Sequence, residues 1–135
     1  MTLLTWNHVG SVGVRALDDQ HGILMDALDD LRLAMARGAG RGEVCELLNR
    51  LIQLTNMHFA SEERLMEQYE YPGLEAHRAE HRQMLSSIRQ SVQRVQHGAE
   101  VGMRPLLASL RDLFAGHIET IDKLYGPWLN QRGVH

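Results

Sequence analysis

Five histidines and two carboxylates fall on four segments of the chain where apolar residues recur with a helical period. These residues are His21, His58, Glu62, His77, His81, His117 and Asp122. The pairs His58 with Glu62 and His77 with His81 have the i, i+4 spacing that places both side chains on one face of a helix. A buried imidazole or carboxylate needs a partner, and one metal ion can partner several of them. The set is enough to ligate two metal ions.

Glycine and proline residues divide the rest of the chain into an N-terminal arm and four expected helices. Residues 1–17 lack a helical period and predict an extended arm. The expected helices span roughly residues 18–37, 43–69, 74–97 and 103–125. Because the connections are short, the sequence predicts an all-α protein, an up-down-up-down four-helix bundle over residues 18–131 that follows the arm.

Capping residues set the expected ends of these helices. Asp18 or Asp19 is the expected N-cap of the first helix, and His97-Gly98 is the expected end of the third. Gly126-Pro127 is expected to stop the fourth helix.

The seven candidate ligands agree with this topology. They lie early in the first and third helices and late in the second and fourth. Antiparallel alternation therefore brings all of them to one end of the bundle. We expect His8, His97 and His135, in the arm, at a helix end and in the tail, to stay outside the site.

Each element of the pattern also has a structural interpretation. A buried histidine such as His21 is often a hydrogen-bonded core residue, and histidine pairs also occur on solvated helix faces. His117 and Asp122 are five residues apart, which places them about 140° from each other around an ideal helix. Either the helix is distorted near Ile121, or Asp122 enters a two-metal site from the side.

Composition limits the classes of function. The chain has 135 residues, enough for a single domain over 1–135, and a net charge of -3 with mixed signs, which disfavours a nucleic-acid partner. Its apolar runs are too short to span a bilayer, and the N-terminus lacks the order of a signal peptide, so we expect a cytoplasmic protein with no membrane span. Cys45 is the single cysteine, which leaves no intrachain disulfide and no thiolate metal site.

Three motifs together resemble the hemerythrin family over nearly the whole chain. They are Trp6 with Ser11-Val12-Gly13-Val14 and Asp18-Asp19-Gln20-His21; His58-Phe59-x-x-Glu62-Glu63-x-x-Met66 with Tyr71-Pro72 and His77-x-x-x-His81; and His117-Ile118-x-x-x-Asp122-Lys123-x-Tyr125. The five-residue step to Asp122 is itself part of the family pattern. Met84 and Phe114 stand where larger aromatic residues are often seen, which could reshape the pocket without removing a ligand.

The resemblance implies a non-haem di-iron centre with two Fe ions and an oxo or hydroxo bridge. It assigns Glu62 and Asp122 as bridging carboxylates between the irons. By the same resemblance, His77, His81 and His117 hold one iron, and His21 and His58 hold the other. The second iron then keeps one open coordination position, where dioxygen or a small anion such as azide would bind.

The implied function is reversible dioxygen binding, for oxygen transport, storage or delivery, and not enzymatic turnover. Imidazole-rich surroundings suit iron(II), and the apolar residues expected beside the open position, Leu24, Phe59 and Ile118, exclude water. Three alternatives stay open. They are an oxygen or redox sensor domain from a longer protein; a di-iron enzyme that reduces peroxide or nitric oxide or oxidises iron; and a structural bundle that binds adventitious zinc.

Overall fold

The computed structural model describes residues 13–97, 103–117 and 123–135, and these contain five α-helices and no strand. The helices are α1 (Arg15–Ala36), α2 (Arg41–Gln68), α3 (Leu74–Gln96), α4 (Met103–His117) and α5 (Lys123–Asn130). Residues 1–12, which include most of the expected arm, lie outside the described residues, as do Gly98, Ile118 and Asp122.

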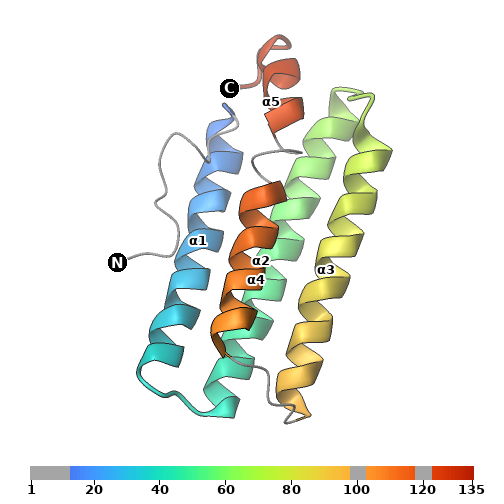
Figure 1. Cartoon of the computed structure of the whole chain (residues 1–135). Helices are drawn as coiled ribbons and strands as arrows, with labels where there is room; N and C mark the ends of the chain where they lie inside the picture. The colour runs from blue at the N-terminus through green and yellow to red at the C-terminus, as the bar shows by residue number, and fades with distance from the viewer. Residues whose placement is uncertain (1–12, 98–102, 118–122) are drawn as a thin grey trace.

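The first four helices form an antiparallel bundle (Figure 1). Helix α1 packs against α2, α2 against α3, α3 against α4, and α4 against α1, so the four helices close a ring. Successive helices run in opposite directions, and α5 lies beyond the C-terminal end of α4. The predicted up-down-up-down four-helix bundle is therefore confirmed. No helix among the described residues has the length and apolarity that a membrane crossing requires.

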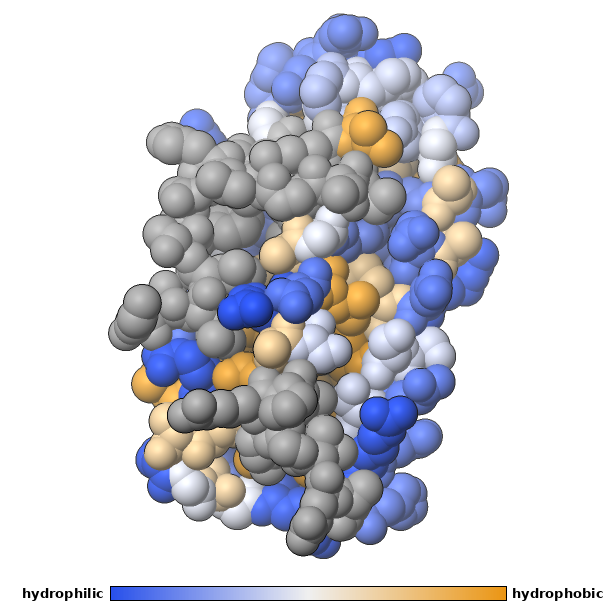
Figure 2. All heavy atoms as spheres, viewed as in Figure 1, coloured by the Kyte–Doolittle hydropathy of each residue, from blue (hydrophilic) through white to orange (hydrophobic). Residues whose placement is uncertain are grey.

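Apolar stripes hold the bundle together. In α1, Leu17, Leu24, Leu28 and Leu31 are each 1% exposed, and their spacing by three, four and seven places them on one side of the helix. Burying one such side chain stabilises the fold by about 1.5 to 3 kcal/mol. On the face drawn in Figure 2, hydrophilic side chains predominate around a central group of apolar side chains.

The connection between α1 and α2 explains why these helices are antiparallel neighbours. Gly38 has a φ of +75° just after the end of α1, a backbone conformation that glycine adopts without a steric cost. The amide of Ala39 then donates to the carbonyl of Ala34 at 2.9 Å, which closes the end of the helix. The chain reverses within residues 37–40 and enters α2.

The predicted start of the first helix is wrong. Helix α1 begins at Arg15, and its N-cap is Val14, which makes no side-chain capping hydrogen bond. Val14 is 2% exposed and Leu17 1%, so packing of this first turn against the core starts the helix earlier than the capping signal suggests. Asp18 lies in the first turn, where its charge still favours the helix N-terminus.

The predicted end of the fourth helix is also wrong. Gly126 and Pro127 lie inside α5, instead of stopping a helix. Pro127 is the fifth of the eight residues of α5, so its missing amide removes a single hydrogen bond from this short helix. Within α5, Leu124 is 64% exposed, whereas Tyr125 is fully buried. The third helix ends as predicted, with His97 as the C-cap residue of α3.

We expect two glycine substitutions near the connection between α1 and α2 to change the free energy of unfolding in opposite directions. An added Cβ would meet nothing within 4 Å at either Gly38 or Gly42. Gly38→Ala should lower the free energy of unfolding by about 1 kcal/mol, because alanine is strained at positive φ. Gly42→Ala should raise it by up to about 1 kcal/mol, because Gly42 lies inside α2. Chemical denaturation followed by circular dichroism measures both, and a stabilising Gly38→Ala would contradict this account.

Candidate metal centre

One end of the bundle collects six of the seven predicted site residues. They are His21 on α1, His58 and Glu62 on α2, His77 and His81 on α3, and His117 at the end of α4. None of the six is more than 6% exposed. The prediction that these side chains gather at one end is confirmed for the described residues, and Asp122 lies outside them.

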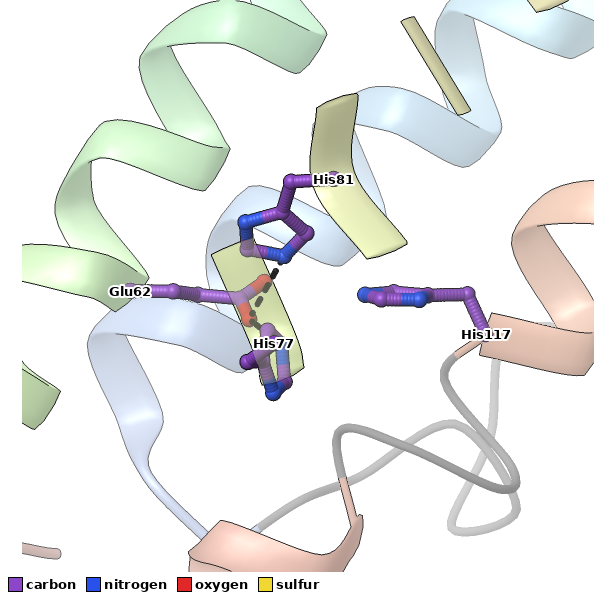
Figure 3. A group of neighbouring side chains, drawn as sticks. All are labelled: Glu62, His77, His81 and His117. Atoms are coloured by element: carbon purple, nitrogen blue, oxygen red, sulfur yellow. Dashed lines mark hydrogen bonds and ion pairs between the residues drawn. The ribbon is translucent and has the colours of Figure 1, made fainter. Parts of the chain in front are cut away.

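The carboxylate of Glu62 lies at the centre of the group. Its Oε1 atom faces the Nε2 atoms of His58 and His21, the latter at 3.7 Å. Its Oε2 atom faces Nε2 of His77 at 3.1 Å and Nε2 of His81 at 3.6 Å. Figure 3 shows the carboxylate between His77 and His81, with the His117 ring pointing toward the same space from α4. The two oxygens of one side chain therefore face two different sets of imidazoles.

Glu62 is held in its charged form. Burial raises the pKa of its carboxyl group, but the charge of His58 and the hydrogen bonds from His21, His58 and His77 act in the opposite direction. The net result is a pKa well below the ordinary value for glutamate. A fully buried carboxylate that remains ionised is a strong point of attraction for a cation.

The outer nitrogen of His81 is fixed by a second carboxylate. Its Nδ1 atom lies 2.8 Å from Oε2 of Glu63, and because a carboxylate accepts, Nδ1–H is the donor. The neutral ring then keeps a lone pair on Nε2, which is buried and makes no hydrogen bond within the described part of the chain. The ring is also stacked on Phe59, with centroids 3.7 Å apart and planes within 4°. His81 is thus oriented as a metal ligand would be.

The outer nitrogen of His58 has a different support. Its Nδ1 atom lies 2.7 Å from Oε1 of Gln20, so Nδ1–H donates and Nε2 again faces the cluster. The Gln20 amide donates to the hydroxyl of Ser61 at 3.2 Å, and this hydroxyl donates to the carbonyl of Met57 at 3.0 Å. This chain of bonds fixes the orientation of the Gln20 amide and of the His58 ring.

The walls around the cluster are apolar and aromatic. Phe59 is 3% exposed and also faces the rings of His58 and His117, with centroids 6.0 and 5.7 Å away. Tyr125, from α5, packs its ring 5.3 Å from that of His77. Leu24 on α1 is 1% exposed and lines the same groove as His58. These side chains give the polar cluster an apolar surrounding that includes Leu24 and Phe59.

The donor set fits a metal site. The ligand atoms of Glu62, His77, His81 and His117 all lie within 4.8 Å of one another, and so do those of His21, His58 and Glu62. Glu62 belongs to both groups. Imidazole nitrogen with a carboxylate oxygen is a usual ligand combination for divalent transition metals such as iron and zinc.

Gln20 and Glu63 are site residues whose roles the sequence pattern does not indicate. Each stands next to a predicted ligand in the sequence, so each points about 100° away from it around the helix. The sequence alone gives no signal that Gln20 faces His58 on another helix or that Glu63 faces His81. That information lies in how α1 and α3 pack on α2.

Comparison with known proteins assigns the family. The family model described as "Hemerythrin HHE cation binding domain" matches residues 12–129. The chain belongs to the hemerythrin family. It is 34% identical to the bacteriohemerythrin of Methylococcus capsulatus over 96% of this chain and 99% of that protein. It is 30% identical to the bacteriohemerythrin of Ralstonia nicotianae, with 98% and 93% covered.

Solved hemerythrin structures have the same fold. A wild-type hemerythrin crystal structure matches with a TM-score of 0.84 and 35% identity, covering 93% of this chain and 96% of that one. The crystal structure of a hemerythrin point mutant matches with a TM-score of 0.85 and 35% identity, over 94% of this chain and 97% of that one. Hemerythrins are an oxygen-binding family whose domain implies a non-haem di-iron site. Membership agrees with the predictions of a metal-binding helical bundle and of a binding protein instead of an enzyme.

We expect histidines inside and outside the cluster to differ in metal binding. His81→Ala removes a buried imidazole that faces Glu62 and should lower the number of metal ions bound per chain. His97→Ala changes an exposed residue at the end of α3 and should leave it unchanged. Elemental analysis of both variants, purified in parallel with the wild type, measures the effect. Metal loss in His97→Ala but not in His81→Ala would contradict the placement of the site.

Proposed function

We propose that this hemerythrin binds dioxygen reversibly at a non-haem di-iron centre and serves as an oxygen carrier, store or delivery protein. The observation that carries the proposal is the position of Glu62, whose two oxygens face separate groups of imidazoles. A carboxylate in this position can bridge two metal ions. The arrangement therefore supports a two-metal centre over a single-metal site.

The proposed ligands divide between the two irons. His77, His81 and His117 would hold one iron, and His21 and His58 the other. Glu62 would bridge them together with Asp122, the ligand outside the described residues. When bound, the irons supply the electrons and the open coordination position that dioxygen binding needs. Small anions such as azide would compete for that position.

The surroundings of the cluster favour binding over catalysis. The buried hydroxyl of Thr55, outside the cluster, does not serve as a proton donor to a ligand, because it donates to the carbonyl of Leu51 in its own helix at 2.6 Å. Apart from Glu62, no buried carboxylic acid that could deliver a proton and promote bond cleavage lies in the described part of the chain. Phe59 and Leu24 limit access of water, which protects a reversibly bound ligand.

Reversible oxygenation and iron content test the proposal together. Protein expressed in iron-replete cells should contain two iron ions per chain. After anaerobic reduction, oxygen should produce a visible absorption band that disappears under inert gas and returns on repetition, and azide should suppress it. Full occupancy by zinc would contradict the di-iron centre. Oxygen consumption in a single pass, sustained by an added reductant, would identify an oxidase or reductase instead of a carrier.

We also expect the apolar wall to set the lifetime of the oxygenated form. Leu24→Ala opens space beside His58 and should admit water, so that irreversible oxidation becomes severalfold faster. Leu28→Ala is the matched control, because Leu28 is equally buried one turn further along α1. Each substitution should cost about 2 to 5 kcal/mol of stability. The decay of the visible band measures the oxidation rate of each variant. Equal rates in the two variants would show that Leu24 does not limit the access of water.

A further inference from the structure

His81 and His58, on opposite sides of Glu62, are hydrogen-bonded to supporting groups of different charge. Glu63, behind His81, is a carboxylate, whereas Gln20, behind His58, is a neutral amide. Both acceptors hold an Nδ1–H group at nearly the same distance, 2.8 and 2.7 Å. The geometry of support is therefore the same for these two histidines, one from each half of the site, and the charge of the supporting group is different.

The charge on Glu63 is not cancelled by its surroundings. Arg78 contacts it at 3.2 Å, but the same guanidinium also pairs with Glu75 at 2.7 Å and Glu67 at 3.2 Å. The side chain of Glu63 is 25% exposed, whereas those of Glu67 and Glu75 are 69% and 79% exposed. Among these carboxylates, Glu63 alone is both sheltered from solvent and bonded to the cluster.

The side of the cluster behind His58 opens onto a groove between α1 and α2. This groove has a volume of about 290 Å³, and Gln20, Leu24, His58 and Arg64 are among the residues that line it. Arg64 is the charged residue of this lining, and it is cationic. An anion therefore supports the imidazole on one side of Glu62, while a neutral amide beside a cation and solvent supports the imidazole on the other.

An anionic acceptor on Nδ1–H makes an imidazole a stronger donor at Nε2, and removing such partners typically costs 10- to 100-fold in metal affinity. We propose that Glu63 and Gln20 are positioning residues that make the two halves of the metal centre unequal. The half containing His81 takes the first cation, and the half containing His58 takes the second. This inference rests on the proposed two-metal centre and adds the order and strength of loading.

The number of ligands also favours the half that contains His81, because His77, His81 and His117 outnumber His21 and His58. A comparison of the two halves in the wild-type protein alone would therefore not isolate the supporting groups. Exchange of the groups isolates their charge, since Glu63→Gln and Gln20→Glu each preserve size and an acceptor oxygen toward the imidazole. Gln20→Glu also removes the amide that donates to Ser61. Glu67→Gln is the control, because Glu67 pairs with Arg78 but not with His81.

The test is a titration of the metal-free full chain with Co²⁺ against a competing chelator, followed by visible absorption. The wild type should bind two ions in two steps. Glu63→Gln should weaken the first step 10- to 100-fold and leave the second within about threefold. Gln20→Glu should strengthen the second step by a similar factor. Glu67→Gln should change neither step by more than about threefold, because an exposed charge is screened by solvent.

The reduction potential of the iron-loaded protein gives a second readout that a loss of packing would not produce. Glu63→Gln should raise the potential of one iron couple and Gln20→Glu should lower that of the other, by about 59 mV for each tenfold change in the Fe³⁺ to Fe²⁺ affinity ratio. Equal weakening of both Co²⁺ steps in Glu63→Gln would overturn the inference. If that variant does not fold, an unchanged second step in Gln20→Glu overturns it. A wild type that binds fewer than two ions would instead refute the proposed function.

Discussion

The buried charge of Glu62 is the constraint on which the rest of this structure depends. A fully buried carboxylate costs several kcal/mol unless other groups compensate it. Here the compensation comes from imidazoles on α1, on α2 itself and on α3. Three helices must therefore meet at fixed positions around one side chain, and α4 contributes His117 to the same group. Assembly of the bundle end and assembly of the site are the same event.

Apolar burial in the remainder of the bundle offsets the free-energy cost of burying this polar cluster. Away from the cluster, the core residues of α2 and α3 are apolar apart from Thr55, and they include Leu48, Leu51, Ile88 and Val92, each 4% exposed or less. Apolar burial of this kind is the dominant favourable contribution to folding. An apolar part and a polar end thus share one set of helices, so the six candidate ligands that the structure describes lie on helices and not on loops.

Supporting contacts distinguish this cluster from a set of histidines that happen to be buried. The outer nitrogens of His58 and His81 each have a hydrogen-bond acceptor, which leaves the inner nitrogens facing Glu62. Phe59 restricts rotation of the His81 ring by stacking on it. Preorganised ligands lose less conformational freedom when they bind an ion. The hemerythrin family assignment and the geometry of the cluster therefore both support a metal-binding site.

The sequence by itself determined the antiparallel four-helix bundle and which candidate ligands share a helix face, because short connections and residue spacing are local features. The i, i+4 spacing of His58 with Glu62 fixes a shared helix face wherever the helix is placed, and short connections force antiparallel neighbours. Tertiary structure decided the start of α1 at Arg15 and the inclusion of Pro127 in α5, because packing overrode the capping signals. It also decided that Gln20 faces His58 and Glu63 faces His81. Those contacts depend on how each helix is rotated against its neighbour, which is set by the fit of whole apolar faces and not by any local pattern.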